Sequence, residues 1–284
     1  MFEIILPLVF IALLVASYID IKIMEVPDWI SYGLMFAGIG IRLIYSYSEA
    51  NWNLLFEGLL GLGTTFLVSC VFFYTGQWGG GDSKLLIGLG ALFGIKWTTW
   101  IQPMPILLTS IFAAGAFYGM FWSVALFFIN KDKCFAHFAE LHKKGVGGKN
   151  LILLAAIIIL IIGIFLGNMP MSLMFIMFSL FMVLIYYTWL FFKVLEKICM
   201  QKYVLPSELT EGDWIVEDIV VDKKIICGPK DLGIDRTQIS ELKKLYNEKK
   251  INKVLIKEGI PFVPSFFIGY LIMLGIFYYF GFAF

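Results

Sequence analysis

The sequence predicts an all-α polytopic membrane bundle of about eight transmembrane helices, with a small α+β cytoplasmic insert before the last helix. Of the 284 residues, 60% are hydrophobic and only 15% are charged, and the mean hydropathy is +0.86. Soluble domains are about 45–50% apolar and about 25% charged. Long apolar segments follow one another along the chain, and one polar block interrupts them near the C-terminus. Together these features indicate a membrane protein.

Each expected span follows from the length of its apolar segment, since a transmembrane helix needs about 20 predominantly apolar residues. The eight candidates are residues 4–19, 29–47, 54–74, 85–101, 106–129, 151–166, 171–192 and 263–284. Lys96 interrupts the fourth, but a lysine near a helix end can extend its amine to the interface. The first span has no basic stretch before it and no small-residue cleavage pattern. We therefore expect it to be retained rather than removed as a signal peptide.

The placement of lysine and arginine predicts the orientation. With strict alternation of the spans, 20 of the 22 Lys and Arg residues fall on one side, and the exceptions are Arg42 and Lys96. That side consists of the loops 20–28, 75–84 and 130–150 and the polar block 193–262. The positive-inside rule puts it in the cytoplasm and both termini outside.

The polar block divides the chain into a membrane domain with seven spans (1–192), a cytoplasmic α+β insert (193–262) and the last transmembrane helix (263–284). About 70 residues bury only a modest core. The insert has no phosphate loop or nucleophile motif, so we interpret it as a substrate-docking or stabilising module. The lysine-rich loop 130–150 is interpreted as a topological anchor, with contact to anionic lipid head groups as the alternative.

Within the insert, the sequence predicts a ββαβ-like unit. Residues 214–221 are rich in β-branched side chains and suggest a strand, with 223–227 as its partner after a turn at Asp222. A helix follows, capped by Asp235 or Thr237, because apolar residues then recur at helical spacing. Residues 254–256 suggest a last short strand.

We expect no cofactor, metal ion or nucleic acid. The cysteines (Cys70, Cys134, Cys199 and Cys227) form no C-x-x-C pair, which argues against a zinc cluster or a disulfide framework. The only histidines, His137 and His142, are expected to be solvated loop residues. A net charge of +1 indicates no basic patch for nucleic acid.

Two acids at the ends of apolar segments are the candidate catalytic residues. Asp82 follows the run Gly79-Gly80-Gly81, and Asp20 follows the first apolar segment. Both lie on the predicted cytoplasmic side. A carboxylate pair can hydrolyse peptides when one ionised acid activates water and one protonated acid polarises the carbonyl, because two close like charges share a proton.

The glycine run is expected to let an extended substrate backbone approach Asp82, since Gly79, Gly80 and Gly81 can adopt positive φ. An ordinary turn between helices is the alternative interpretation. Asp20 competes with Glu25 and Asp28 for the second catalytic role, and we choose Asp20 because it is closest to the apolar segment.

Other polar residues receive structural interpretations. Asp28 follows Pro27 and is expected to cap the next helix. Arg42 and Glu57 lie inside spans; Arg42 is expected to snorkel or to form a pair, and Glu57 to be interfacial or to pair with it. Gly90-x-x-x-Gly94 and Gly115-x-x-x-Gly119 are typical of close helix contacts.

These motifs resemble those of the GxGD membrane aspartyl peptidases, and more narrowly the archaeal type IV prepilin and preflagellin (archaellin) peptidases. The similarity includes Asp20-Ile-Lys-Ile-Met-Glu-Val-Pro27-Asp28, Gly79-Gly80-Gly81-Asp82-Ser-Lys84 and Glu258-Gly259-Ile-Pro261-Phe-Val-Pro264. The resemblance implies that Asp20 and Asp82 are the catalytic pair. It also implies pilin-like or archaellin precursors with a short, charged leader as substrates, cut on the cytoplasmic side of the membrane.

Two departures leave questions open. Bacterial relatives often carry a cysteine-rich zinc loop and methylate the new N-terminus of the product. This chain lacks that loop, which argues against methyltransferase activity. The insert is larger than in the simplest preflagellin peptidases, so the choice between pilin and archaellin is open, as is the oligomeric state.

Two alternatives to a leader peptidase fit the sequence less well. A presenilin or signal-peptide-peptidase relative would carry a tyrosine before Asp20, where Ile19 stands. A proton-coupled transporter would place its acids near the middle of the bilayer, in broken helices, whereas Asp20 and Asp82 lie at segment ends.

Overall fold

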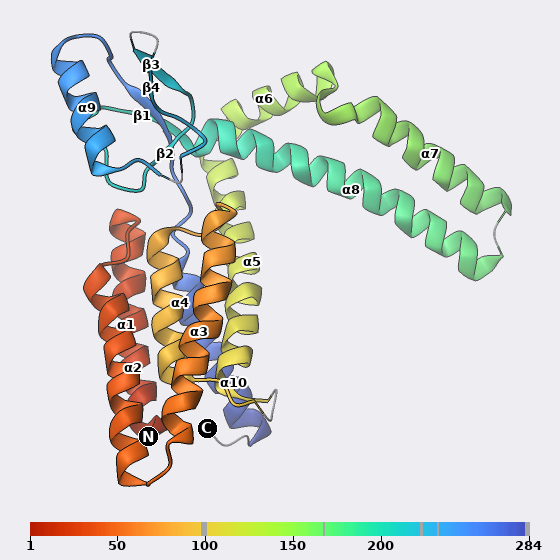
Figure 1. Cartoon of the computed structure of the whole chain (residues 1–284). Helices are drawn as coiled ribbons and strands as arrows, with labels where there is room; N and C mark the ends of the chain where they lie inside the picture. The colour runs from red at the N-terminus through yellow and green to blue at the C-terminus, as the bar shows by residue number, and fades with distance from the viewer. Residues whose placement is uncertain (98–100, 167, 222–223, 232, 282–284) are drawn as a thin grey trace.

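The computed structural model describes residues 1–97, 101–166, 168–221, 224–231 and 233–281. Six helices form one upright bundle (Figure 1). They are α1 (Phe2–Ile23), α2 (Asp28–Ser48), α3 (Asn53–Tyr74), α4 (Gly80–Phe93), α5 (Pro103–Ile129) and α10 (Val263–Phe280). α4 packs against α2 and α3, and α10 packs against α5 and α1. This arrangement confirms the expected helical membrane bundle and brings the last helix back beside the first.

The buried side chains of the bundle are almost all aliphatic or aromatic. They include Ile5, Val9, Leu13, Leu85, Leu86, Leu89, Leu107, Ile111, Phe266 and Met273. Glycine allows the closest helix approaches. A Cβ at Gly90 would overlap the side chain of Thr65 on α3, and one at Gly115 would lie 2.6 Å from the Phe262 ring. Gly119, by contrast, has no neighbour at that position. A Cβ at Gly94 would overlap the guanidinium of Arg42. Three of the four glycines in the predicted contact motifs, Gly90, Gly94 and Gly115, therefore lie at close contacts.

Among the described residues, six stretches are long and apolar enough to cross a membrane: α1, α3, α5, residues 146–165, α8 (Met169–Cys199) and α10. Each of the eight expected segments contains a helix, but two of these helices are not long or apolar enough to count as spans by themselves. α4 is too short, and α2 carries Asp28 and Arg42 among its apolar residues. Both lie within the same bundle, where neighbouring helices cover Arg42 at 1% exposure, whereas Asp28 at the start of α2 is 62% exposed.

The fourth expected span, residues 85–101, is wrong in its limits. α4 begins earlier and ends at Phe93, with Gly94 at a φ of 65°. Its 14 residues reach only about 21 Å at 1.5 Å per residue. Lys96 therefore lies in a loop, where its backbone N–H donates to Gln102 Oε1 at 2.6 Å. Residues 98–100 of the expected span lie outside the described residues.

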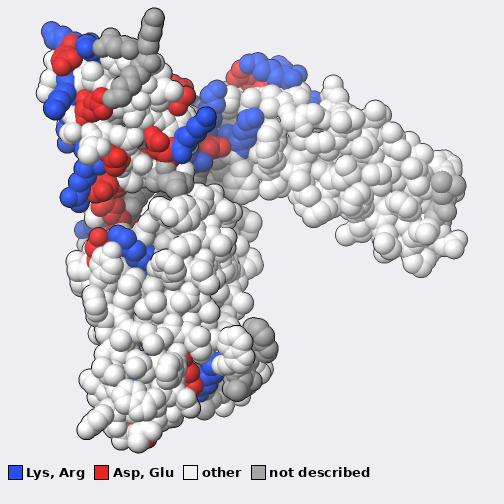
Figure 2. All heavy atoms as spheres, viewed as in Figure 1, with Lys and Arg blue, Asp and Glu red and all other residues white. Residues whose placement is uncertain are grey.

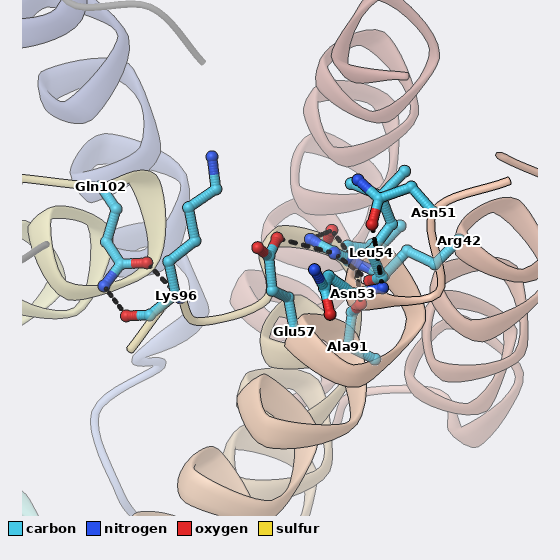
Figure 3. A network of polar contacts seen from close by, with 9 residues as sticks. Arg42, Asn51, Asn53, Leu54, Glu57, Ala91, Lys96 and Gln102 are labelled. Carbon is cyan, nitrogen blue, oxygen red and sulfur yellow. Dashed lines mark hydrogen bonds and ion pairs between the residues drawn. The ribbon is translucent and has the colours of Figure 1, made fainter. Parts of the chain in front are cut away.

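Arg42 explains why α4 ends where it does (Figure 3). Its side chain is 1% exposed, and Nε donates to the Ala91 and Leu92 carbonyls, both at 3.1 Å. Nη1 donates to the Leu54 carbonyl at 2.7 Å. The last carbonyls of a helix have no partner within it, so the guanidinium of α2 caps α4. Glu57 lies 3.9 Å from Nη1, which confirms the pairing considered for these residues.

The region 130–150, expected to be a loop, contains the helix α6 (Lys131–Lys144) and the short 3-10 helix η1 (Val146–Gly148). α7 (Lys149–Leu166) and α8 follow and pack against each other. In Figure 1 this hairpin extends away from the bundle, and α8 packs against α5 and α6 at the end where the hairpin meets the bundle. α8 continues through Cys199, past the expected domain boundary at residue 192.

The insert contains two small sheets and one helix. Its elements are β1 (Gln201–Val204), β2 (Trp214–Ile215), β3 (Ile219–Val221), β4 (Lys224–Cys227), α9 (Arg236–Asn247) and β5 (Val254–Lys257). One antiparallel sheet has the order β1-β5-β2, and β3 pairs with β4 in the other. The core includes Val204, Ile215, Leu242 and Val254.

The insert differs from the expected ββαβ unit in two respects. The single strand expected at 214–221 is two strands in different sheets, because β2 pairs with β5 whereas β3 pairs with β4. β1 was not expected. The helix start at Asp235 is confirmed, since its Oδ1 accepts the Gln238 N–H at 2.7 Å. The turn expected at Asp222 lies outside the described residues.

Charged side chains gather over the insert and α6, while the visible surfaces of the bundle and of the α7–α8 hairpin are almost free of charge (Figure 2). Many large apolar side chains on those helices are exposed, such as Phe36 at 77% and Phe165 at 80%. Apolar exposure on this scale fits contact with lipid rather than with water. The chain is therefore a multi-pass membrane protein.

Candidate active site

Asp20 lies in the last turn of α1 and faces the beginning of α10. Its side chain is only 5% exposed, and Oδ2 accepts the Val263 N–H at 2.9 Å. Ser17, one turn earlier, donates to the Val263 carbonyl at 3.3 Å. A carboxylate at the N-terminus of a helix is stabilised by the unpaired N–H groups there. α1 thus holds the first residue of α10 through two polar side chains.

Asp82 lies in the first turn of α4. Its side chain is half-buried, and Oδ2 accepts the Gly79 N–H at 3.3 Å. The sequence folds this way because Gly79 has extended backbone angles and the helix begins at the next residue. Asp82 therefore also occupies a helix N-terminus, where the peptide dipoles favour a negative charge.

An aromatic cluster joins the segment before Asp82 to the start of α10, which contacts Asp20. Trp78, directly before Gly79, is 6% exposed. Its ring centroid lies 4.7 Å from that of Phe72 on α3 and 5.7 Å from that of Phe262, directly before Val263. Trp78 also contacts Phe266 of α10 and Phe112 of α5. The structure therefore places both acids at the end of the bundle that faces the insert (Figure 1).

The glycine run differs from its expected conformation. Gly79 has a φ of −71°, and Gly80 and Gly81 belong to α4, so none of the three adopts positive φ. Gly81 is needed for close packing instead, since a Cβ there would lie 2.9 Å from Cβ of Val26 in the α1–α2 turn. A Cβ built at Gly80 would lie 3.8 Å from Phe73 Cε2, an ordinary van der Waals distance, so close packing does not require a glycine there.

A second contact joins the two motif segments. Lys84 Nζ lies 2.6 Å from Asp28 Oδ1, and the two side chains are 38% and 62% exposed. The expected N-cap role of Asp28 is wrong: Pro27 occupies the N-cap position, and Asp28 is the first residue of α2. Glu25 is exposed. Asp20 is thus the buried acid among the three candidates in this segment.

Among the described residues, no three His, Cys, Asp or Glu side chains gather as a metal site would require. His137 and His142 lie on α6 rather than in a loop. His137 Nδ1 is 3.1 Å from Glu140 Oε2, and the His142 ring stacks with Tyr187 of α8. Burial raises the pKa of the Cys134 thiol to about 11, which disfavours the thiolate that a metal would bind.

Trp78 and Phe262 were not expected from the sequence, although their contact joins the segment before Asp82 to the start of α10. The available signals were a tryptophan directly before the glycine run and a phenylalanine between Pro261 and Pro264. Neither residue type by itself distinguishes a site from a packed core, because both are common in apolar cores.

The sequence is similar to that of known peptidases. Residues 8–120 match the type IV leader peptidase family. This region includes both Asp20 and Asp82, and the match confirms the resemblance seen in their motifs. Over 82 residues the chain is 33% identical to the preflagellin peptidase of Methanococcus maripaludis and 32% identical to those of Methanococcus voltae and Methanocaldococcus jannaschii. No solved structure matches this chain.

The similarity to these relatives is partial. The aligned segment covers 29% of this chain and 35% of each preflagellin peptidase. The chain therefore spans about a third of the length of the curated relatives it matches. Residues beyond 120, including the α7–α8 hairpin and the insert, lie outside the family match.

Proposed function

We propose that this protein is a membrane aspartyl endopeptidase that removes short, charged leader peptides from type IV pilin-like precursors, either prepilin or preflagellin. One observation carries the proposal: Asp20 on α1 accepts the first N–H of α10, Asp82 lies in the first turn of α4, and the residues that precede α10 and Gly79, Phe262 and Trp78, contact each other. Both acids lie within the residues that match the leader peptidase family. The similar preflagellin peptidases make archaellin precursors the first substrates to test.

The chemistry assigned to the pair follows from their surroundings. Asp20 and Asp82 share a proton because two neighbouring carboxylates resist joint ionisation. The ionised member takes a proton from the attacking water, and the protonated member donates a hydrogen bond to the scissile carbonyl. Asp82 lies in the first turn of α4, and Asp20 accepts the first N–H of α10, so a helix N-terminus favours the ionised form of each acid. The backbone at Gly79–Gly81 is proposed to line the path of the unwound substrate.

The active site is proposed to face the cytoplasm, with both termini outside. The concentration of charge over the insert and α6 supports this orientation, because these elements carry most of the lysines (Figure 2). The proposed domains are the membrane domain 1–192, the cytoplasmic insert 193–262 and the last helix 263–284.

Cleavage of a precursor tests the proposed function. Membranes that contain the full chain are expected to shorten a preflagellin or prepilin precursor by the length of its leader, as measured by mass spectrometry of the product. Membranes without the chain are the control. If the folded protein cleaves neither precursor, the proposed substrate class is wrong.

Labelling of an introduced cysteine tests the orientation. Glu248→Cys in the insert is expected to react with a membrane-impermeant maleimide only in inside-out vesicles, and Asn51→Cys between α2 and α3 only in right-side-out vesicles. Both side chains are exposed. The unmodified chain reports the background from its four native cysteines. The opposite labelling pattern would reverse the proposed orientation.

A further inference from the structure

The insert touches the membrane domain at the segment that leads to Asp82. The chain between α3 and α4 turns at Gly76, whose φ of 69° lies in the left-handed region that favours glycine. Trp214, the first residue of β2, covers this turn. A Cβ added at Gly76 would lie 3.0 Å from Trp214 Cη2 and 3.5 Å from Cζ3. The indole therefore packs on the backbone a few residues before Gly79.

The same sheet is connected to the helix that holds Asp20. β2 pairs with β5, with Trp214 opposite Lys257. β5 ends at Lys257, and residues 258–262 lead directly into α10. Val263, the first residue of α10, donates its N–H to Asp20. This sheet thus contacts the segment before Asp82 through the Trp214 indole. It is also connected to Asp20, because residues 258–262 run from β5 to Val263.

This sheet is fixed at several points. Ile215 and Ile256 are 5% and 6% exposed in the core of the insert. At the end of β5, the Glu258 N–H donates to the Met200 carbonyl at 2.7 Å, and Lys257 Nζ lies 2.6 Å from Glu196 Oε1 on α8. These contacts hold the sheet to the end of α8, so Trp214 lies on a packed strand rather than on a free loop.

We propose that Trp214 is a positioning residue for Asp82. Its indole holds the turn at Gly76 against the sheet that also leads into α10. This contact fixes the position of Asp82 relative to Asp20. The catalytic consequence rests on the proposed peptidase function, but the ordering of the turn does not. Trp214→Ala removes the ring from the turn, whereas Trp214→Phe keeps an aromatic ring there.

Hydrogen exchange of the full chain in detergent tests the ordering. In Trp214→Ala the amides of residues 75–82 are expected to exchange about tenfold faster than in the wild type, since local opening depends on the contacts that close a segment. The amides of β5 are expected to keep their protection. Tyr203→Ala is the matched control, because Tyr203 is an aromatic residue on the outer strand of the same sheet and is 62% exposed. Trp214→Phe is expected to restore most of the protection.

Kinetics with a precursor tests the positioning. In Trp214→Ala, kcat is expected to fall about tenfold with KM little changed, because misplacing a catalytic group slows chemistry more than binding. Trp214→Phe is expected to recover much of kcat. Unchanged exchange at residues 75–82 would overturn the proposal, as would faster exchange throughout the insert. A change in KM alone would also overturn it. If Trp214 orders the turn but the wild type cleaves no precursor, the contact stands and the proposed peptidase function fails.

Discussion

Replacing either Asp20 or Asp82 by asparagine is expected to lower leader cleavage by about 10²–10⁴-fold, the range that a general acid or base contributes. Asparagine has the shape of aspartate but cannot exchange the proton that the reaction needs. In membranes that contain Asp20→Asn or Asp82→Asn, the initial rate of precursor shortening measures the loss. The thermal unfolding temperature of each variant is expected to stay near that of the wild type.

Asparagine also separates the catalytic from the structural role of Asp20. Its amide oxygen can still accept the Val263 N–H, so the start of α10 keeps its partner. If Asp20→Asn cleaves normally and only Asp20→Ala is defective, Asp20 merely caps α10 and the catalytic pair is wrong. Glu25→Gln is the matched control, since Glu25 is a nearby acid on the same segment and is exposed. This variant is expected to cleave at the wild-type rate.

The transmembrane helices and the two acids could be predicted because their signals are local. Hydropathy along the chain indicates each span without knowledge of its neighbours. Asp20 and Asp82 stand out because acids at the ends of apolar segments are unusual. The catalytic role of the pair is a prediction that Asp20→Asn and Asp82→Asn test.

Features that depend on distant partners could not be predicted. The end of α4 is set by Arg42 from another helix, and the division of residues 214–221 between two sheets is set by pairing with β5. The helix α6 is different, because a local signal was present. Cys134, Phe138 and Leu141 recur at helical spacing and are buried or half-buried, but the surrounding lysines suggested a loop.

Replacing Arg42 by methionine is expected to destabilise the membrane domain by about 3–5 kcal/mol, the usual cost of removing one partner from a buried charged network. The guanidinium donates to the carbonyls of Ala91, Leu92 and Leu54, and methionine would leave these acceptors without their donor. Gly58 and Gly94 leave space for the arginine side chain, so the shorter methionine also leaves a gap. Thermal unfolding in detergent measures the loss.

Glu57→Gln is the matched control for Arg42→Met, and it distinguishes helix capping from ion pairing. Glu57 is 22% exposed and lies 3.9 Å from Arg42, so the loss of this pair is expected to cost only about 1 kcal/mol. Arg42→Lys is expected to fall between the two, since one ammonium group cannot reach all three carbonyls in the planar geometry of a guanidinium. If Glu57→Gln proves as damaging as Arg42→Met, the charge pair rather than the capping of α4 holds this end of the bundle together. An Arg42→Met chain that unfolds at the wild-type temperature would contradict both explanations, because α4 would then keep its position between α2 and α3 without the guanidinium.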